Sequence, residues 1–208
     1  MREERDGRFY RHSGPEIYLV GIGMGGEGQL TLESQRVIAE ADVVAGAGRM
    51  LKSVENLLFG KKVLDCYEAD EIGRWLEAQR EEIQTGVILF SGDTGFYSGA
   101  KKVKEKLELS GWKVTVLPGI SSISYCAARF GIRQIREHGK CFFLLGGQIT
   151  PEILCENMIE NGLGDCLLSF GSDLSYPEEN QLSGSVRQLL TEQKKELEDL
   201  SRLVCCFI

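Results

Sequence analysis

The stretch IYLVGIGMGG, residues 17–26, places an apolar run directly before a cluster of glycines. The run 17–20 predicts a buried strand, and the glycines predict a sharp turn with exposed backbone amides. Gly21 to Gly26 fit the G-x-G-x-x-G pattern, so a nicotinamide-dependent oxidoreductase is one hypothesis. Such a site also needs an acidic residue closing the second strand, which here ends in Ala45-Gly46-Ala47-Gly48. A tight turn without a ligand stays open as well.

Beyond this stretch, short β-rich runs alternate with helical patterns, which predicts an α/β fold with a parallel sheet between helices. A polar tail at 1–15 precedes an N-terminal α/β domain at 16–117. Pro118-Gly119 marks the boundary to a C-terminal α/β domain at 118–208. We expect strands at 17–20, 42–45, 62–66, 87–90, 113–117, 141–145, 166–170 and 203–207, helices at 31–40, 71–83, 98–109, 121–130, 151–160 and 186–199, and a long irregular loop at 171–184.

Composition excludes several classes of partner and site. The net charge of -7 and the absence of a basic stripe argue against nucleic acid and anionic membranes as partners. No apolar run approaches the roughly 20 residues of a membrane span, so we expect a cytoplasmic protein. The seven cysteines form no C-x-x-C pair, which indicates reduced thiols. The sequence has no His/Cys cluster at ligand spacing, so we expect no metal bound by the protein. The apolar pattern at 186–200 indicates core packing.

Two further glycine-containing segments follow predicted strands. Ser91-Gly92-Asp93-Thr94-Gly95-Phe96-Tyr97 offers exposed backbone and an aromatic surface that suit a flat adenosine or macrocycle, although Asp93 could simply cap the next helix. Pro118-Gly119-Ile120-Ser121-Ser122 opens a helix, for which Ser121 is a plausible cap. Because parallel strands bring their carboxyl ends to one edge, we expect all three loops to converge on one cleft.

Together, GIGMGG at 21–26, SGDTGFYSG at 91–99 and PGISS at 118–122 resemble the tetrapyrrole (corrin/porphyrin) methylase family. Members of that family carry GxGPG, GDP and PGxSS-like elements in this order, and the likeness covers nearly the whole chain from Ile17. Residues 44–51 and 174–179 look most like the C5-methylating branch, the cobalt-precorrin-7 or precorrin-6Y methyltransferases.

The resemblance implies two small α/β domains with S-adenosylmethionine in the cleft between them, in a homodimer. Met24 and Thr94 stand where the family has proline, which relaxes both loops. The cofactor contacts that the resemblance implies are Met24, Ser91, Gly92, Asp93, Phe96, Ser121, Ser122 and Leu145.

Methyl transfer from a sulfonium needs positioning and exclusion of water, and it needs no metal. Asp93 and Tyr97 are the candidates for a base, and Tyr97 also for substrate binding. An acidic protein must meet a substrate rich in carboxylates with local cations. Arg49 is the first choice, because Gly46 and Gly48 would leave the cleft open beside it. A solvated arginine at a helix start is an equally open interpretation.

The resemblance further implies that cobalt arrives only as part of the substrate, and that a separate polypeptide supplies any C15-methylating decarboxylase. A methylase of the same fold acting on another ring position, a protein or RNA stays open. A binding module without turnover is the third alternative.

Overall fold

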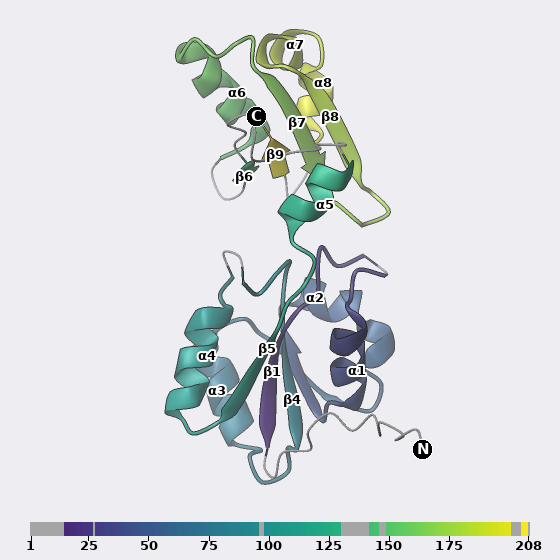
Figure 1. Cartoon of the computed structure of the whole chain (residues 1–208), viewed down its shortest axis with the longest axis vertical. Helices are drawn as coiled ribbons and strands as arrows, with labels where there is room; N and C mark the ends of the chain where they lie inside the picture. The colour runs from purple at the N-terminus through teal and green to yellow at the C-terminus, as the bar shows by residue number, and fades with distance from the viewer. Residues whose placement is uncertain are drawn as a thin grey trace, which may run out of the picture.

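The computed structural model describes residues 15–26, 28–95, 98–129, 142–145, 149–200 and 205–207, with backbone alone for 142–144 and 205–207. Its strands form two sheets, in two lobes stacked along the long axis of the molecule (Figure 1). The first lobe holds a five-stranded parallel sheet in the order β3-β2-β4-β1-β5. These strands are β1 (Glu16–Gly21), β2 (Val43–Gly46), β3 (Lys62–Asp65), β4 (Thr85–Phe90) and β5 (Lys113–Leu117).

Helices cover both faces of the first sheet, with α3 and α4 on one side and α1 and α2 on the other (Figure 1). Along β1, Ile17 and Leu19 join the apolar cluster under α3 and α4, whereas Tyr18 and Val20 pack beneath α1. Each fully buried Ile or Leu stabilises the fold by about 1.5–3 kcal/mol. The elements are α1 (Leu32–Glu40), α2 (Gly48–Ser53), the 3-10 turn η1 (Glu55–Leu57), α3 (Ala69–Glu77) and α4 (Ala100–Leu109).

The second lobe holds a four-stranded sheet in the order β6-β9-β7-β8, with antiparallel neighbours. The buried Val186, Leu189, Leu197 and Leu200 pack in its core, so the apolar pattern at 186–200 does serve core packing. Helix α5 (Ser122–Arg129) lies between the two lobes (Figure 1). The other elements are β6 (Phe142–Leu144), α6 (Pro151–Glu160), β7 (Leu167–Ser172), β8 (Asn180–Ser185), α7 (Val186–Thr191), α8 (Lys194–Glu198) and β9 (Cys205–Phe207).

The expected loop at 171–184 is wrong in its second half. Residues 180–185 form β8, which pairs with all of β7. The sequence NQLSGS has a single large apolar residue, Leu182, so it carries no alternating pattern that would predict a strand. The expected helix at 186–199 is also divided into α7 and α8, because Gln193 leaves helical geometry at φ -123° and ψ 27°.

Two corrections apply to the first lobe. Helix α2 and η1 were not among the expected helices, since the short segment 48–57 has no long apolar period, although a helix start at Arg49 was left open. Helix α3 starts at Ala69 and ends at Glu77, whereas the prediction ran from 71 to 83. The buried Ile83 still packs in the core from the turns that follow α3.

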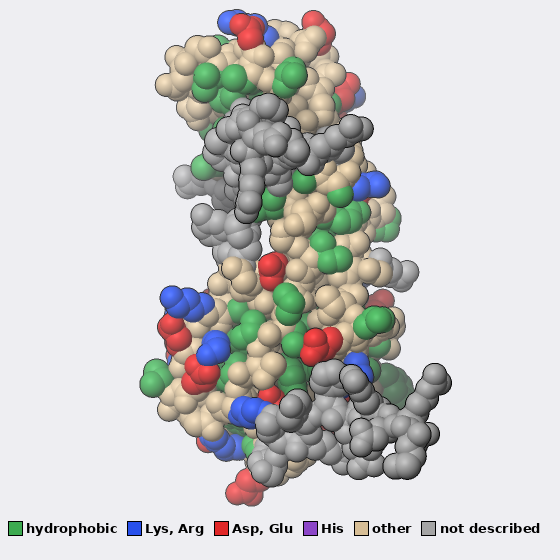
Figure 2. All heavy atoms as spheres, viewed as in Figure 1, with side chains coloured by type: hydrophobic (Ala, Val, Ile, Leu, Met, Phe, Trp, Pro, Cys, Tyr) green, Lys and Arg blue, Asp and Glu red, His purple; other side chains and the backbone are tan. Residues whose placement is uncertain are grey.

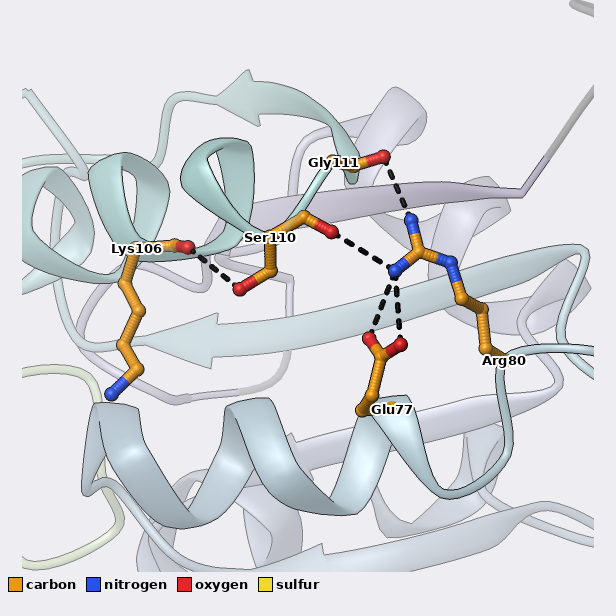
Figure 3. Close-up of polar contacts among 5 residues, drawn as sticks. All are labelled: Glu77, Arg80, Lys106, Ser110 and Gly111. Carbon is orange, nitrogen blue, oxygen red and sulfur yellow. Dashed lines mark hydrogen bonds and ion pairs between the residues drawn. The ribbon is translucent and has the colours of Figure 1, made fainter.

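Side chains bind backbone groups near the amino ends of the strands of the first sheet, which we call the amino edge (Figure 3). Arg80 donates from Nη1 to the Glu77 carboxylate and to the Ser110 carbonyl, at 2.9 and 3.0 Å, and from Nη2 to the Gly111 carbonyl at 2.8 Å. Its guanidinium also lies 4.4 Å from the ring centre of Trp112. Arg80 therefore satisfies carbonyls at the end of α4 and joins the turns that lead into β4 and β5.

Charged side chains of both signs lie on the surface, and several thiols lie inside the fold. On the face shown in Figure 2, basic and acidic side chains alternate over α3 and α4. Cys66 and Cys155 are buried free thiols, and Cys126 is buried as well. Burial raises the pKa of Cys155 to about 11, with Glu152 and Glu156 adding to the effect. Among the described helices, none has the length and apolar character needed to span a membrane.

Candidate functional site

The strand order creates a topological switch point at the carboxyl ends of β1 and β4. These two strands are neighbours in the sheet. From β1 the chain continues through α1, on one face of the sheet, to β2. From β4 it continues through α4, on the opposite face, to β5. Open α/β sheets bind ligands at such a point, because the diverging connections leave the strand ends uncovered. The segments that follow β1 and β4 are the glycine-rich loops 21–26 and 91–95.

These two loops are joined through their backbones. The amide of Gly23 donates to the carbonyl of Gly92 at 3.1 Å, and the amide of Gly92 donates to the carbonyl of Gly23 at 2.6 Å. Both residues have positive φ, 66° and 69°, a conformation that glycine adopts at little cost. The glycines are therefore required by the backbone geometry of the site.

The third segment, 118–122, meets the other two through Gly119. A Cβ atom at Gly21 would lie 2.6 Å from the amide nitrogen of Gly119 and 2.8 Å from the carbonyl oxygen of Gly92. A Cβ atom at Gly119 would collide with the Gly92 oxygen and lie 2.7 Å from Gly21. The prediction that the three loops converge at the strand ends is confirmed.

The second loop leaves its backbone accessible. Ser91 is exposed, and a Cβ atom at Gly92 would have nothing within 4 Å. The Oδ1 atom of the partly buried Asp93 accepts the amide of Gly95 at 3.0 Å, so Asp93 shapes its own turn. The alternative that Asp93 caps the next helix is wrong, because α4 begins later, at Ala100, after Gly99.

Thr94 and Met24 tie the two loops to neighbouring elements. The buried Thr94 donates its hydroxyl to the carbonyl of Leu117 at 2.9 Å, at the end of β5. Met24 is 8% exposed and packs with Cys126 of α5 and with Leu174, which follows β7. Met24 therefore links the first loop to α5 and to the segment after β7.

Three further predicted cofactor residues, Ser121, Ser122 and Leu145, lie on or near the second lobe. Ser121 accepts the amide of Ser124 at 3.3 Å and so acts as the helix cap that the sequence allowed, while Ser122 is the first residue of α5. Both are half-buried. Leu145 packs against the core of the second lobe. Phe96 and Tyr97 lie outside the described residues.

Residues 173–179, which we call the strap, cross from the second lobe onto the first loop. The amide of Gly26 donates to Ser175 Oγ at 2.9 Å. A Cβ atom at Gly26 would collide with the Ser175 carbonyl, and one at Gly25 with the hydroxyl of Tyr176. The strap therefore covers the glycine-rich loop at contact distance.

Arg49 lies beside the strap, near the start of α2. It is exposed, and its Nη1 atom donates to the hydroxyl of Tyr176 at 2.9 Å. The reason for choosing it was wrong, because Gly46 and Gly48 do not open a cleft. A Cβ atom at Gly46 would lie 3.0 Å from Leu89, and one at Gly48 would lie 2.7 Å from Asp65 Oδ2.

Glu179 anchors the strap and was missed as a site residue. Its Oε2 atom accepts the Ser175 amide at 2.8 Å and the Tyr125 hydroxyl at 3.1 Å. Its Oε1 atom accepts from Arg129 at 2.6 and 2.7 Å and from Gln181 at 2.9 Å. Burial alone would raise the pKa of Glu179, but these hydrogen bonds outweigh it and lower the pKa.

A groove of about 680 Å³ between α3 and α4 does not compete as the site. It lies on the outer face of the first lobe, and its charged lining residues are largely paired, Lys106 with Asp70 and Glu77 with Arg80. None of the glycine-rich loops lines it. In the part of the chain that the structure describes, no three His, Cys, Asp or Glu side chains are grouped to hold a metal ion.

Comparison with known proteins decides the family. The model of the tetrapyrrole (corrin/porphyrin) methylases matches residues 16–153, which include all three loops. The chain belongs to the tetrapyrrole methylase family. It is 29% identical over 184 residues, or 84% of its length, to the cobalt-factor III methyltransferase of Priestia megaterium. The chain spans about a third of the length of that relative, 34%.

Two further tetrapyrrole methylases are similar along both lobes. The cobalt-precorrin-7 C(5)-methyltransferase of Salmonella typhimurium is 24% identical over 180 residues, which cover 78% of this chain and 87% of that protein. The uroporphyrin-III C-methyltransferase of Thermus thermophilus, complexed with S-adenyl homocysteine, superposes with a TM-score of 0.71 at 20% identity. That superposition covers 92% of this chain and 91% of the other, and it shows that the fold is shared.

At the two positions where the tetrapyrrole methylase pattern has proline, Thr94 and Met24 make tertiary contacts. Where the family has proline, the Thr94 side chain restrains the second loop through its bond to Leu117. The Met24 side chain restrains the first loop by apolar packing on α5. Each of these side chains therefore makes a tertiary contact that helps to hold its loop.

Proposed function

We propose that the chain transfers a methyl group from S-adenosylmethionine to a ring carbon of a corrin precursor. The observation that carries the proposal is the meeting of three glycine-rich loops at the switch point of a tetrapyrrole methylase. The relatives named for cobalt-factor III and cobalt-precorrin-7 methylation support a substrate of this class.

The residues at the strand ends fit the cofactor. Gly92 has open space beside it, Ser91 is exposed, and Asp93 Oδ2 makes no hydrogen bond to the described residues. These groups would hold the polar parts of the cofactor, which supplies an electrophilic methyl group when bound. The further contacts that we propose are Met24, Phe96, Ser121, Ser122 and Leu145.

Positioning supplies much of the rate in such a reaction. The loops orient the cofactor, and the strap, which lies on the first loop, would help to exclude water. Asp93 and Tyr97 are the proposed candidates for accepting the proton that leaves the ring carbon. Arg49 is exposed beside the strap and would meet a substrate carboxylate, offsetting the repulsion from a chain of net charge -7.

Within this class, we propose C5 of cobalt-precorrin-7 as the methylated position. The two segments that carry the branch resemblance, 44–51 and 174–179, contact each other through Arg49 and Tyr176. This contact supports the idea that they act together on the substrate. A second candidate is cobalt-factor III, because its methyltransferase is 29% identical over 84% of the chain.

The test is anaerobic incubation with methyl-labelled S-adenosylmethionine and either cobalt-precorrin-7 or cobalt-factor III, followed by NMR of the product. Label at C5 of the first compound supports the proposal in full. Label on cobalt-factor III alone keeps the methyltransferase and overturns the proposed position. Binding of reduced nicotinamide without binding of S-adenosylmethionine would overturn the proposed activity.

A further inference from the structure

The strap has a shape that its own backbone does not favour. Asp173 and Ser175 have φ values of 46° and 71°, in the left-handed region that residues other than glycine rarely adopt. Such conformations cost on the order of 1 kcal/mol or more each, and they persist when surrounding contacts impose them. Contacts made by the strap, between Asp173 and the start of β8 at Asn180, must therefore hold this shape.

Glu179 is the group in the right place. Its side chain is 12% exposed and receives donors from three directions. The amide of Ser175 comes from the strap itself, Tyr125 and Arg129 come from α5, and Gln181 comes from β8. Charge-assisted hydrogen bonds of this kind are stronger than neutral ones, so the carboxylate joins the strap firmly to both elements.

The contacts of the strap carry this restraint onto the first loop. Ser175, whose amide is held by Glu179, presents its Oγ to the amide of Gly26 at 2.9 Å. The next residue, Tyr176, lies against Gly25 and accepts from Arg49. A change at Glu179 thus alters the support of both the glycine-rich loop and Arg49, although Glu179 contacts neither.

We propose that Glu179 is a positioning residue that holds the strap on loop 21–26 and thereby sets the affinity of the site for S-adenosylmethionine and for the carboxylates of the tetrapyrrole. This inference rests on the proposed function for its ligands. The restraint of loop 21–26 by Glu179 depends only on the contacts that Glu179 and the strap make.

The test compares Glu179→Gln with Glu178→Gln in the full chain. Glu179→Gln replaces one carboxylate oxygen by an NH2 group, which cannot accept a hydrogen bond. This NH2 group would then face one of the N–H or O–H donors that the carboxylate now accepts. Glu178, in contrast, is exposed and makes no hydrogen bond or ion pair among the described residues. Glu179→Asp keeps the charge but is one methylene shorter, so it should fall between wild type and Glu179→Gln.

Hydrogen exchange of the apo protein gives the first readout. We expect amides in 21–26 and 173–179 to exchange roughly tenfold faster in Glu179→Gln, with the core of the second lobe and the Glu178→Gln variant unchanged. Unchanged exchange in 21–26 would overturn the proposal. Loss of protection throughout the second lobe would also overturn it, since Glu179 would then be needed for folding alone.

Calorimetric titration with S-adenosylhomocysteine and steady-state kinetics give the second readout. We expect Glu179→Gln to raise Kd and KM roughly tenfold while kcat changes less than about threefold, with partial recovery in Glu179→Asp. A fall in kcat at unchanged KM and Kd would overturn the role in affinity. If wild type binds no S-adenosylhomocysteine, the proposed function fails, and the exchange experiment still decides whether Glu179 restrains the loop.

Discussion

The two edges of the first sheet are built in different ways. At the amino edge, side chains satisfy the backbone: Asp42 Oδ2 accepts the amides of Gln84 and Thr85, both at 2.8 Å, and Arg80 binds the carbonyls of Ser110 and Gly111. At the carboxyl edge, Gly21, Gly23, Gly92 and Gly119 bring backbone directly against backbone.

This difference separates stability from ligand binding. At the amino edge, the side chains of Asp42 and Arg80 occupy backbone groups that a ligand could otherwise bind. At the carboxyl edge, the exposed Ser91 and the open space beside Gly92 leave backbone at the switch point that a cofactor can approach. Substitutions at the glycine edge should therefore have larger effects than substitutions at the side-chain edge.

The largest effect should come from Gly119→Ala. Its Cβ would collide with the Gly92 carbonyl and the Gly21 backbone, neither of which can rotate away. We expect a loss of about 3 kcal/mol in the free energy of unfolding, measured by urea denaturation, with loss of S-adenosylhomocysteine binding.

Gly95→Ala is the matched control, because its Cβ would lie 3.6 Å from Asp93, an ordinary contact, and its φ is not positive. Equal effects of the two substitutions would contradict the idea that close backbone approach at Gly119 is what requires glycine.

Thr94→Val tests the side-chain contact between the second loop and β5. Valine has nearly the same shape but cannot donate to the Leu117 carbonyl, which would then lose a buried partner. We expect a cost of about 1–2 kcal/mol in urea denaturation. Thr94→Ser keeps the hydroxyl and should lose less. A serine variant as unstable as the valine variant would mean that the methyl group, and not the hydrogen bond, holds the loop.

Glu16 makes the amino edge sensitive to pH. Burial would raise its pKa, but hydrogen bonds from Thr115, Lys113 and Tyr18 outweigh this and lower it from 4.5. Its contribution to stability is therefore present above pH 4.5 and is lost as the pH falls through the lowered value.

Glu16→Gln should cost roughly 1 kcal/mol at pH 7, and this difference from wild type should shrink below pH 4.5. Urea denaturation across this range measures it, with Glu81→Gln as control, because Glu81 is exposed and makes no hydrogen bond or ion pair among the described residues. A difference that grows toward acid pH would have the wrong sign and would contradict this role of Glu16.

Tyr176→Phe should have the smallest effect on stability. It removes the hydroxyl that binds the exposed Arg49, and such contacts contribute less than about 1 kcal/mol. The KM for the corrin substrate should change more than the melting temperature. A large drop in melting temperature with an unchanged KM would assign Tyr176 to folding alone.

Much of the carboxyl edge could be predicted from the sequence, because glycines after apolar strands mark where backbones come close. The loops 21–26, 91–95 and 118–122 were placed correctly for that reason. Helices α1, α4 and α5 were placed within two residues of their observed ends, whereas α3 ends six residues before its predicted end and α2 is too short to show a period.

The strap could not be predicted in the same way. Glu179 is one acid among 31 acidic residues, and its role comes from partners up to 54 positions away along the chain. Met24 and Thr94 stand where the family has proline, and their contacts could not be predicted from the sequence. The structure shows that Met24 packs on Cys126 and that Thr94 donates a hydrogen bond to Leu117. Long-range side-chain contacts leave no periodic signal in a single sequence.

Ligand binding at the glycine edge is tested most directly by hydrogen exchange of the wild-type protein with and without saturating S-adenosylhomocysteine. We expect the ligand to protect loops 21–26, 91–95 and 118–122 together, while the amino-edge turns at 78–84 and 110–112 exchange as before. Protection confined to the groove between α3 and α4, or no protection in any of the three loops, would contradict binding at this edge.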